Sequence, residues 1–163
     1  MVILGVDPGS LRTGYGAIES DGRRHALLEQ GVISLPARAP LGSRLGVIHG
    51  RLGEIIARLG PDVLAVEDLF HGNNTRSALV LAHVRGVVLL AADQAGLDVH
   101  EFSPATVKQQ VTGYGRAQKA QVAMMVARLL NIDGDGVPGD CFDALAVALC
   151  IAHHQPTSAG RRH

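Results

Sequence analysis

The stretch ILGVDPGSLRTGYG, residues 3–16, is the part of the chain that says most about the fold. Val2–Val6 has the apolar composition of a fully buried strand, and the run ends on a carboxylate, Asp7. Pro8 and Gly9 then have the chemistry of the two central positions of a type II turn. A charge at the end of a buried strand is costly unless something pairs with it. Asp7 therefore either caps the turn or holds a cation.

The residues after this turn predict an antiparallel meander. Gly14–Ile18 has the composition of a second strand, and His25–Leu35 of a third. Between them, Ser20-Asp21-Gly22-Arg23 has the residues of a hairpin turn.

A helix and a parallel strand follow the meander. Apolar residues recur at spacings of three and four from Leu41 to Leu59, which is typical of an amphipathic helix. Val63–Glu67 is a further buried strand that also ends on a carboxylate. Two strands joined by a helix are expected to be parallel and in one sheet. Asp7 and Glu67 would then emerge at the same carboxyl-terminal edge.

The second half of the chain predicts four helices and one strand. They are Thr75–Gln94, the strand Asp98–Phe102, a short helix from Pro104, Ala117–Leu130 and Asp140–His154. The stretch Ala78–Ala92 is apolar nearly all round, so that helix is either central or covered by another subunit. The length of 163 residues fits a single α/β domain, which we expect over residues 1–154. Residues 155–163 have the composition of a disordered tail.

Two further acids stand at the start of the last predicted helix. Asp140 and Asp143 are three residues apart, so on a helix they share a face and repel unless a cation or a proton intervenes. N-capping explains Asp140 alone equally well, but it does not explain acids that end buried strands. Four carboxylates at the strand ends of one sheet favour Mg²⁺ or Mn²⁺. Such a site can hold two cations about 4 Å apart and hydrolyse a phosphodiester.

Composition limits the other possibilities. Fifteen basic residues balance fifteen acidic ones, so only a local patch could bind nucleic acid. Lys108 and Lys119 are the only lysines, either for a functional reason or through a codon bias towards arginine. On one helix Cys141 and Cys150 would lie about 13 Å apart, beyond disulfide reach, as in a reduced cytoplasmic protein. We expect no signal peptide, and no apolar run of the roughly 18–20 residues that span a bilayer.

Four collinear motifs resemble those of RuvC-type Holliday-junction resolvases, members of the RNase H-like superfamily. The motifs are GVDPGSLRTGYG, AVED.F..N...AL.L...RG, VKQ.VTGYGRA.K.QV and D..DALAVA, and the likeness runs from about residue 2 to 152. The resemblance implies a mixed five-stranded sheet with helices on both faces. It also implies that four acids are the catalytic metal ligands: Asp7, Glu67, Asp140 and Asp143.

The resemblance further implies the reaction. Enzymes of this kind cut four-way DNA junctions by paired symmetric nicks, leaving 5′-phosphate and 3′-hydroxyl ends, in recombination and repair. Lys119 would stabilise the phosphate charge as a catalytic residue, and Lys108 would bind the DNA backbone. Phe70 would stack on a base, although it could instead fold back over the core. Tyr114 and Arg116, on an exposed loop, and Arg76 are further candidates for DNA contact, although Gly-rich loops often carry an Arg that has no such role.

A symmetric substrate also implies symmetric partners. A C2 homodimer matches the two-fold symmetry of a four-way junction, and in the family a branch-migration complex of the RuvA and RuvB type delivers the substrate. No membrane partner is expected. Two alternatives stay open: an RNase H-like nuclease of ribosomal RNA processing, and a junction-binding module whose acids hold only a structural ion.

Overall fold

The computed structural model describes residues 1–68 and 75–154. The elements are β1 (Val2–Asp7), β2 (Arg12–Ser20), β3 (His25–Ser34), α1 (Leu41–Leu59), β4 (Val63–Glu67), α2 (Thr75–Gln94), β5 (Asp98–Phe102), α3 (Pro104–Thr112), α4 (Lys119–Leu130) and α5 (Gly139–His154). The strands form one sheet in the order β3-β2-β1-β4-β5. β1, β2 and β3 pair antiparallel, whereas β4 is parallel to β1 and to β5. The predicted mixed five-stranded sheet is confirmed.

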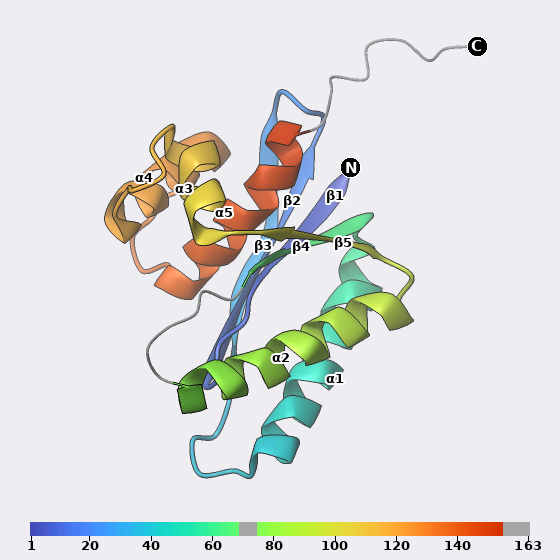
Figure 1. Cartoon of the computed structure of the whole chain (residues 1–163). Helices are drawn as coiled ribbons and strands as arrows, with labels where there is room; N and C mark the ends of the chain where they lie inside the picture. Colours follow the sequence, from blue (N-terminus) through green and yellow to red (C-terminus); the bar gives the residue numbers. More distant parts are fainter. Residues whose placement is uncertain (69–74, 155–163) are drawn as a thin grey trace, which may run out of the picture.

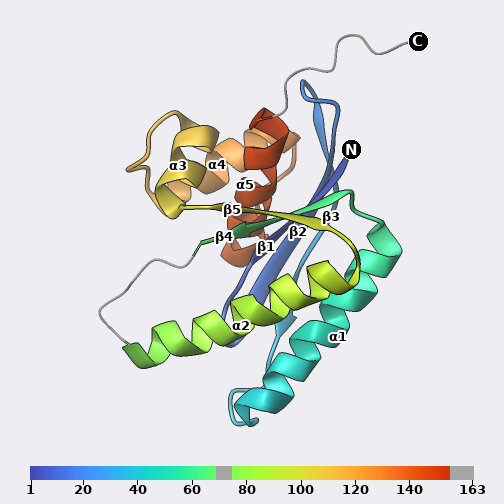
Figure 2. The same cartoon turned by 45° about the vertical axis from the view of Figure 1, so that its right-hand side comes forward.

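Helices cover both faces of the sheet, as Figures 1 and 2 show. Successive residues of a strand point to opposite faces, and β1 follows this rule. Ile3 packs into a core cluster with residues of α3, α4 and α5, while Leu4 and Val6 pack into a second cluster with residues of α1 and α2. Both faces of β1 are thereby buried, as its uninterrupted apolar sequence predicted.

The turn after β1 differs from the predicted type. A type II turn needs a positive φ at its third residue, and Gly9 is not among the positive-φ glycines of the described residues. A close approach makes glycine necessary instead, because a Cβ on Gly9 would lie 1.9 Å from the carbonyl oxygen of Arg12. The Thr13 hydroxyl closes the turn by donating to the Gly9 carbonyl at 3.2 Å.

The last helix lies directly on the glycines of the two central antiparallel strands. A Cβ on Gly5 would stand 2.0 Å from the Ala144 carbonyl oxygen, and a Cβ on Gly14 would stand 2.1 Å from that of Asp140. The absence of side chains at these positions lets the α5 backbone touch β1 and β2. The first turn of α5 is consequently held beside the carboxyl end of β1.

The apolar helix α2 is not central. Val84 and Val88 are buried against the sheet, whereas Leu79 and Leu90 are 60% and 48% exposed. By length and composition alone, Arg76–Gln94 could cross a membrane, with a mean hydropathy of 1.3 and 22% of the segment buried. On that measure the expectation that no segment is long and apolar enough was wrong. The helix was predicted to be either central or covered by another subunit. In a single copy of the chain it is not central, because one of its faces is exposed.

Candidate active site

Two acidic residues emerge side by side at one edge of the sheet. In the parallel ladder between β1 and β4, Val6 pairs with Val66, so Asp7 and Glu67 are the next residues on adjacent strands. Parallel neighbours end at the same edge. The prediction that these carboxylates share an edge is confirmed.

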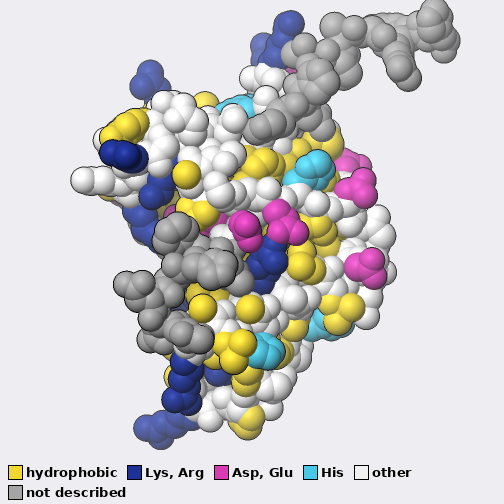
Figure 3. Space-filling model, in the orientation of Figure 1, with side chains coloured by type: hydrophobic (Ala, Val, Ile, Leu, Met, Phe, Trp, Pro, Cys, Tyr) yellow, Lys and Arg dark blue, Asp and Glu magenta, His cyan; other side chains and the backbone are white. Residues whose placement is uncertain are grey.

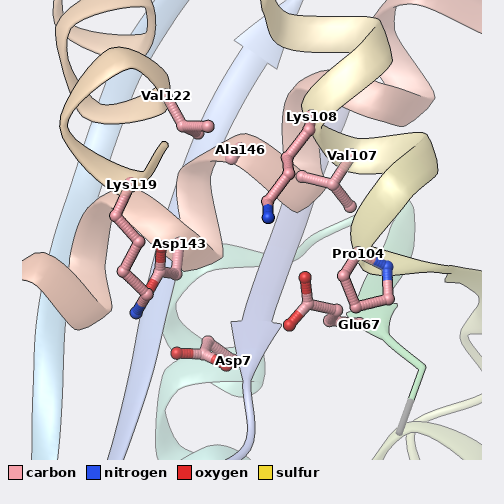
Figure 4. A pocket seen from close by; sticks show the side chains of 9 residues that line it. All are labelled: Asp7, Glu67, Pro104, Val107, Lys108, Lys119, Val122, Asp143 and Ala146. Atoms are coloured by element: carbon pink, nitrogen blue, oxygen red, sulfur yellow. The ribbon is translucent and has the colours of Figure 1, made fainter. Parts of the chain in front are cut away.

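Asp143 joins them from α5. The three acids line a cavity of about 200 Å³. Figure 4 shows their carboxylates and two lysine amino groups directed into one space. The full lining is Asp7, Glu67, Pro104, Val107, Lys108, Lys119, Val122, Asp143 and Ala146. A charged floor with apolar walls limits the water around the acids and strengthens the interactions between them.

Both lysines reach this cavity from neighbouring helices. Lys108 lies on α3, which is capped at its start by the Ser103 hydroxyl, an acceptor for the Thr106 N–H at 3.2 Å. Lys119 is the first residue of α4, and its Nζ donates to Asp143 Oδ2 at 2.6 Å. A codon bias gives no reason for the only two lysines to meet at one acidic cavity, so their placement favours the functional alternative.

The fourth predicted acid, Asp140, lies beside the cavity rather than in its lining. Its Oδ2 accepts a hydrogen bond from Arg12 Nε at 2.7 Å. Its charge still acts on Asp7, contributing to the raised pKa of that residue. The structure thus brings three of the four predicted acids into one cavity and leaves the fourth next to it, paired with an arginine that the sequence did not single out.

Two acids of the cavity, Asp7 and Glu67, have raised pKa values. Burial, followed by the charges of Asp143 and Glu67, raises the pKa of Asp7 to about 7. Burial and then Asp143 raise the pKa of Glu67, with Lys119 and Lys108 opposing the shift. The hydrogen bond to Asp143 in turn raises the pKa of Lys119. Carboxyl groups that resist ionisation together are typical of a site completed by a cation or a proton.

The donor set fits a hard divalent cation. All the candidate ligands are carboxylate oxygens, which Mg²⁺ and Mn²⁺ prefer. Among the residues that the structure describes, no three His, Cys, Asp or Glu side chains already stand in the arrangement that encloses an ion. Two of the acids instead face basic partners, Asp143 with Lys119 and Asp140 with Arg12. An arriving cation would compete with these partners for the carboxylates.

The other candidate residues surround the cavity at varying distance. Tyr114 is 59% exposed and, like the exposed Arg116, lies in the loop between α3 and α4. Arg76, exposed at the start of α2, lines a second cavity that also holds Arg44. In Figure 3 basic side chains gather over α3 and α4 and again near the start of α2. Phe70 lies outside the described residues, so its stacking stays a prediction.

The sequence reasoning missed two determinants of the site. One is Arg12, which holds Asp140. The other is the glycine surface under α5, where Gly14 and Gly16 stand two residues apart and so face the same side of β2. Glycines at alternate positions of a strand are a signal that another backbone comes close, and that signal could have been used.

The fold and the site together define the class of protein. The sheet has two adjacent parallel strands that each end in a carboxylate, with a third acid supplied by a helix packed across them. This is an RNase H-like protein of the nuclease type.

Comparison with known proteins narrows the class to one family. A family model described as crossover junction endodeoxyribonuclease RuvC matches residues 3–153. The chain is 49% identical over 154 residues to the protein of that name from Pelotomaculum thermopropionicum and 50% identical over 153 residues to that from Heliobacterium modesticaldum. Each alignment covers 94% of both chains. The chain therefore belongs to the RuvC family, which sets aside the ribosomal RNA processing alternative.

Solved structures agree with this assignment. Thermus thermophilus RuvC superposes with a TM-score of 0.86 at 35% identity, covering 94% of this chain and 95% of the other. The same protein in complex with Holliday junction substrate gives a TM-score of 0.86 at 33% identity, covering 94% of both chains. A yeast mitochondrial resolvase, at 14% identity and a TM-score of 0.65, shares the fold.

Proposed function

We propose that this chain is a structure-selective endonuclease that resolves four-way DNA junctions by paired nicks, leaving 5′-phosphate and 3′-hydroxyl ends. The observation that carries the proposal is the cavity where Asp7, Glu67 and Asp143 meet both lysines of the chain. Relatives named crossover junction endodeoxyribonuclease, and the likeness to a RuvC bound to a Holliday junction, support the choice of substrate.

The acids are proposed as ligands of two Mg²⁺ or Mn²⁺ ions. Asp7, Glu67 and Asp143 would hold a cation in the cavity, and Asp140 would join them on release from Arg12. Divalent cations at such a site supply Lewis acidity for activating water and for stabilising charge on the phosphate. The raised pKa of Asp7 fits this role, since a cation replaces the proton that burial otherwise favours.

The lysines are proposed to act on the scissile phosphate. Lys119 is 84% exposed on its side chain and is held through Asp143, so it can turn towards a phosphate oxygen once that carboxylate binds a cation. Lys108 faces the same cavity from α3 and would hold the DNA backbone. Tyr114, Arg116 and Arg76 would extend the DNA contact, and Phe70 would stack on a base opened at the junction centre.

We propose a homodimer formed through α2. The exposed side chains of Leu79 and Leu90 leave an apolar surface on that helix for a second copy to cover. A C2 dimer presents two sites to a two-fold symmetric junction. The proposal extends to delivery by a branch-migration complex of the RuvA and RuvB type, to one folded unit over residues 1–154, and to a cytoplasmic location. The predicted tail, residues 155–163, lies outside the described residues. The location fits the reduced, buried thiols of Cys141 and Cys150.

Replacing Asp7 tests the central proposal. Asp7→Asn keeps the shape of the side chain but removes a ligand charge, so junction binding should persist while nicking is abolished. The matched control is Asp98→Asn, an exposed acid at the start of β5 that should cut at the wild-type rate. Gel-shift and cleavage assays would use a synthetic four-way junction beside linear duplex and RNA, each with and without chelator. Cutting that survives in chelator, or that prefers duplex or RNA, would contradict the proposal.

A further inference from the structure

An arginine outside the cavity connects three elements behind Glu67. Arg85 lies on α2, and its side chain is only 16% exposed. Its Nη2 contacts Glu101 Oε2 and lies 3.6 Å from Asp68 Oδ1. In Figure 3 acidic and basic side chains meet over β5, above α2. One guanidinium therefore pairs with Glu101 of β5 and with Asp68, the residue directly after β4, while its own backbone belongs to the helix below them.

The two acids flank the residue pair that ends the parallel ladder. Glu67 pairs with Phe102 across β4 and β5. Asp68 directly follows Glu67, and Glu101 directly precedes Phe102. The Asp68 N–H also donates to the Phe102 carbonyl at 2.8 Å, which extends the ladder by one bond. Arg85 consequently fastens both strands at the position where β4 delivers Glu67 to the cavity.

We propose that Arg85 is a positioning residue for Glu67: by pairing with Asp68 and Glu101 it holds the ends of β4 and β5 on α2 and sets the direction of the Glu67 carboxylate. The inference rests on the proposed role of Glu67 as a metal ligand. Side chains that orient a ligand from outside the site typically change metal affinity or activity 10–100-fold when removed.

The ion pairs of Arg85 affect the position of the strand ends more than the stability of the fold. Asp68 and Glu101 are 56% and 46% exposed, so the ion pairs are screened and add little to the unfolding free energy. Without Arg85, however, α2 would lose its side-chain contact with Glu101 of β5 and with Asp68 at the end of β4. The guanidinium has little freedom, because it is largely enclosed and engaged by two carboxylates.

The ion pairs of Arg85 also connect α2 to the active site. α2 is the helix whose exposed leucines are proposed to contact a second copy of the chain. A change in the position of α2 would therefore change the position of Glu67 through Arg85. Association of two subunits through α2 would affect Glu67 in both active sites in the same way.

The test compares Arg85→Gln and Arg85→Lys in the full-length protein. Mn²⁺ binding would be measured by titration calorimetry without DNA, and kcat and KM on a synthetic four-way junction. We expect Arg85→Gln to weaken Mn²⁺ binding and lower kcat about 10–100-fold while leaving KM and junction affinity unchanged. Arg85→Lys keeps the charge and should recover most of both losses.

A matched control lies at the other edge of the sheet. Arg58 of α1 pairs with Glu29 of β3, with Nη2 2.9 Å from Oε1, and so also ties a helix to a strand. Arg58→Gln should leave Mn²⁺ binding and kcat unchanged and the melting temperature nearly so, since the pair is largely exposed. The inference is overturned if Arg85→Gln behaves like Arg58→Gln, or if its junction affinity falls as far as its kcat.

A second variant, at an acidic partner of Arg85, keeps the test decisive if Arg85→Gln folds poorly. Glu101→Gln changes an exposed side chain but removes the closest anchor of Arg85, and it should weaken Mn²⁺ binding in the same direction. Unchanged Mn²⁺ binding in folded Glu101→Gln refutes the inference. If the wild-type protein cuts no junction at all, the proposed function fails, whereas the Mn²⁺ titrations still decide the role of Arg85.

Discussion

Replacing Gly14 by alanine tests whether the contact between α5 and β2 sets the site. Gly14 pairs with Asp7 in the antiparallel ladder and lies under the first turn of α5. A Cβ at this position would stand 2.1 Å from the Asp140 carbonyl oxygen and 3.0 Å from its Cβ. Ordinary contact begins at 3.4 Å. Because the obstructing atom is backbone, no rotamer change relieves the clash, and the start of α5 must move by about 1 Å.

That displacement has two measurable costs. Overpacking of a well-packed site destabilises by about 1–3 kcal/mol, which for a chain of this size lowers the melting temperature by about 2–4 °C per kcal/mol. Moving a catalytic group by 1 Å costs about 10²-fold in rate. Asp140 and Asp143 both lie in the first turns of α5 and would move with it. We therefore expect the rate of nicking of a four-way junction to fall about 100-fold. A loss of about 1–3 kcal/mol in stability would leave most of the protein folded at 25 °C and would not explain a fall of that size.

Thermal unfolding and single-turnover cleavage would be measured for Gly14→Ala beside Gly50→Ala. Gly50 lies in the interior of α1, and a methyl group added there would have nothing within 4 Å, so that change should stabilise by about 0.5–1 kcal/mol and leave cleavage intact. A Gly14→Ala protein that melts and cuts like the wild type would refute the idea that this contact positions the acids.

Three other outcomes follow from the geometry. The folded state of the metal-free protein binds a proton at Asp7 up to about pH 7, whereas an ordinary Asp loses it near 3.8, so stability should fall as pH rises from about 4 to 7. Denaturant titrations in chelator should show this fall, and Asp7→Asn should reduce it to the part that Glu67 contributes, because the pKa of Glu67 is raised as well. Lys119→Met should slow nicking about 10²–10³-fold with junction affinity kept, and a proportional loss of affinity would mark Lys119 as a binding residue instead. Leu79→Glu with Leu90→Glu should yield monomers in sedimentation analysis, and an unchanged mass would place the subunit contact elsewhere.

Local pattern was sufficient to predict most of the elements and part of the site. The period of three and four from Leu41 to Leu59 predicted α1 to the residue. The shared edge of Asp7 and Glu67 followed from the crossover between β1 and β4, since a helix linking two neighbouring strands makes them parallel. The predicted second strand was shorter than β2, which extends to Arg12 and Ser20 because pairing with two neighbours continues past the apolar residues.

Tertiary structure decided what the acids contact. Nothing local in the sequence shows that Arg12 holds Asp140 across 128 residues, that Lys119 holds Asp143, or that Arg85 joins α2 to the ends of two strands. Periodicity reports which face of an element is apolar, and turn residues report where it ends. Distances between charged groups depend on how closely two backbones pack, and here that packing is set by glycines whose partners lie on a helix more than a hundred residues away.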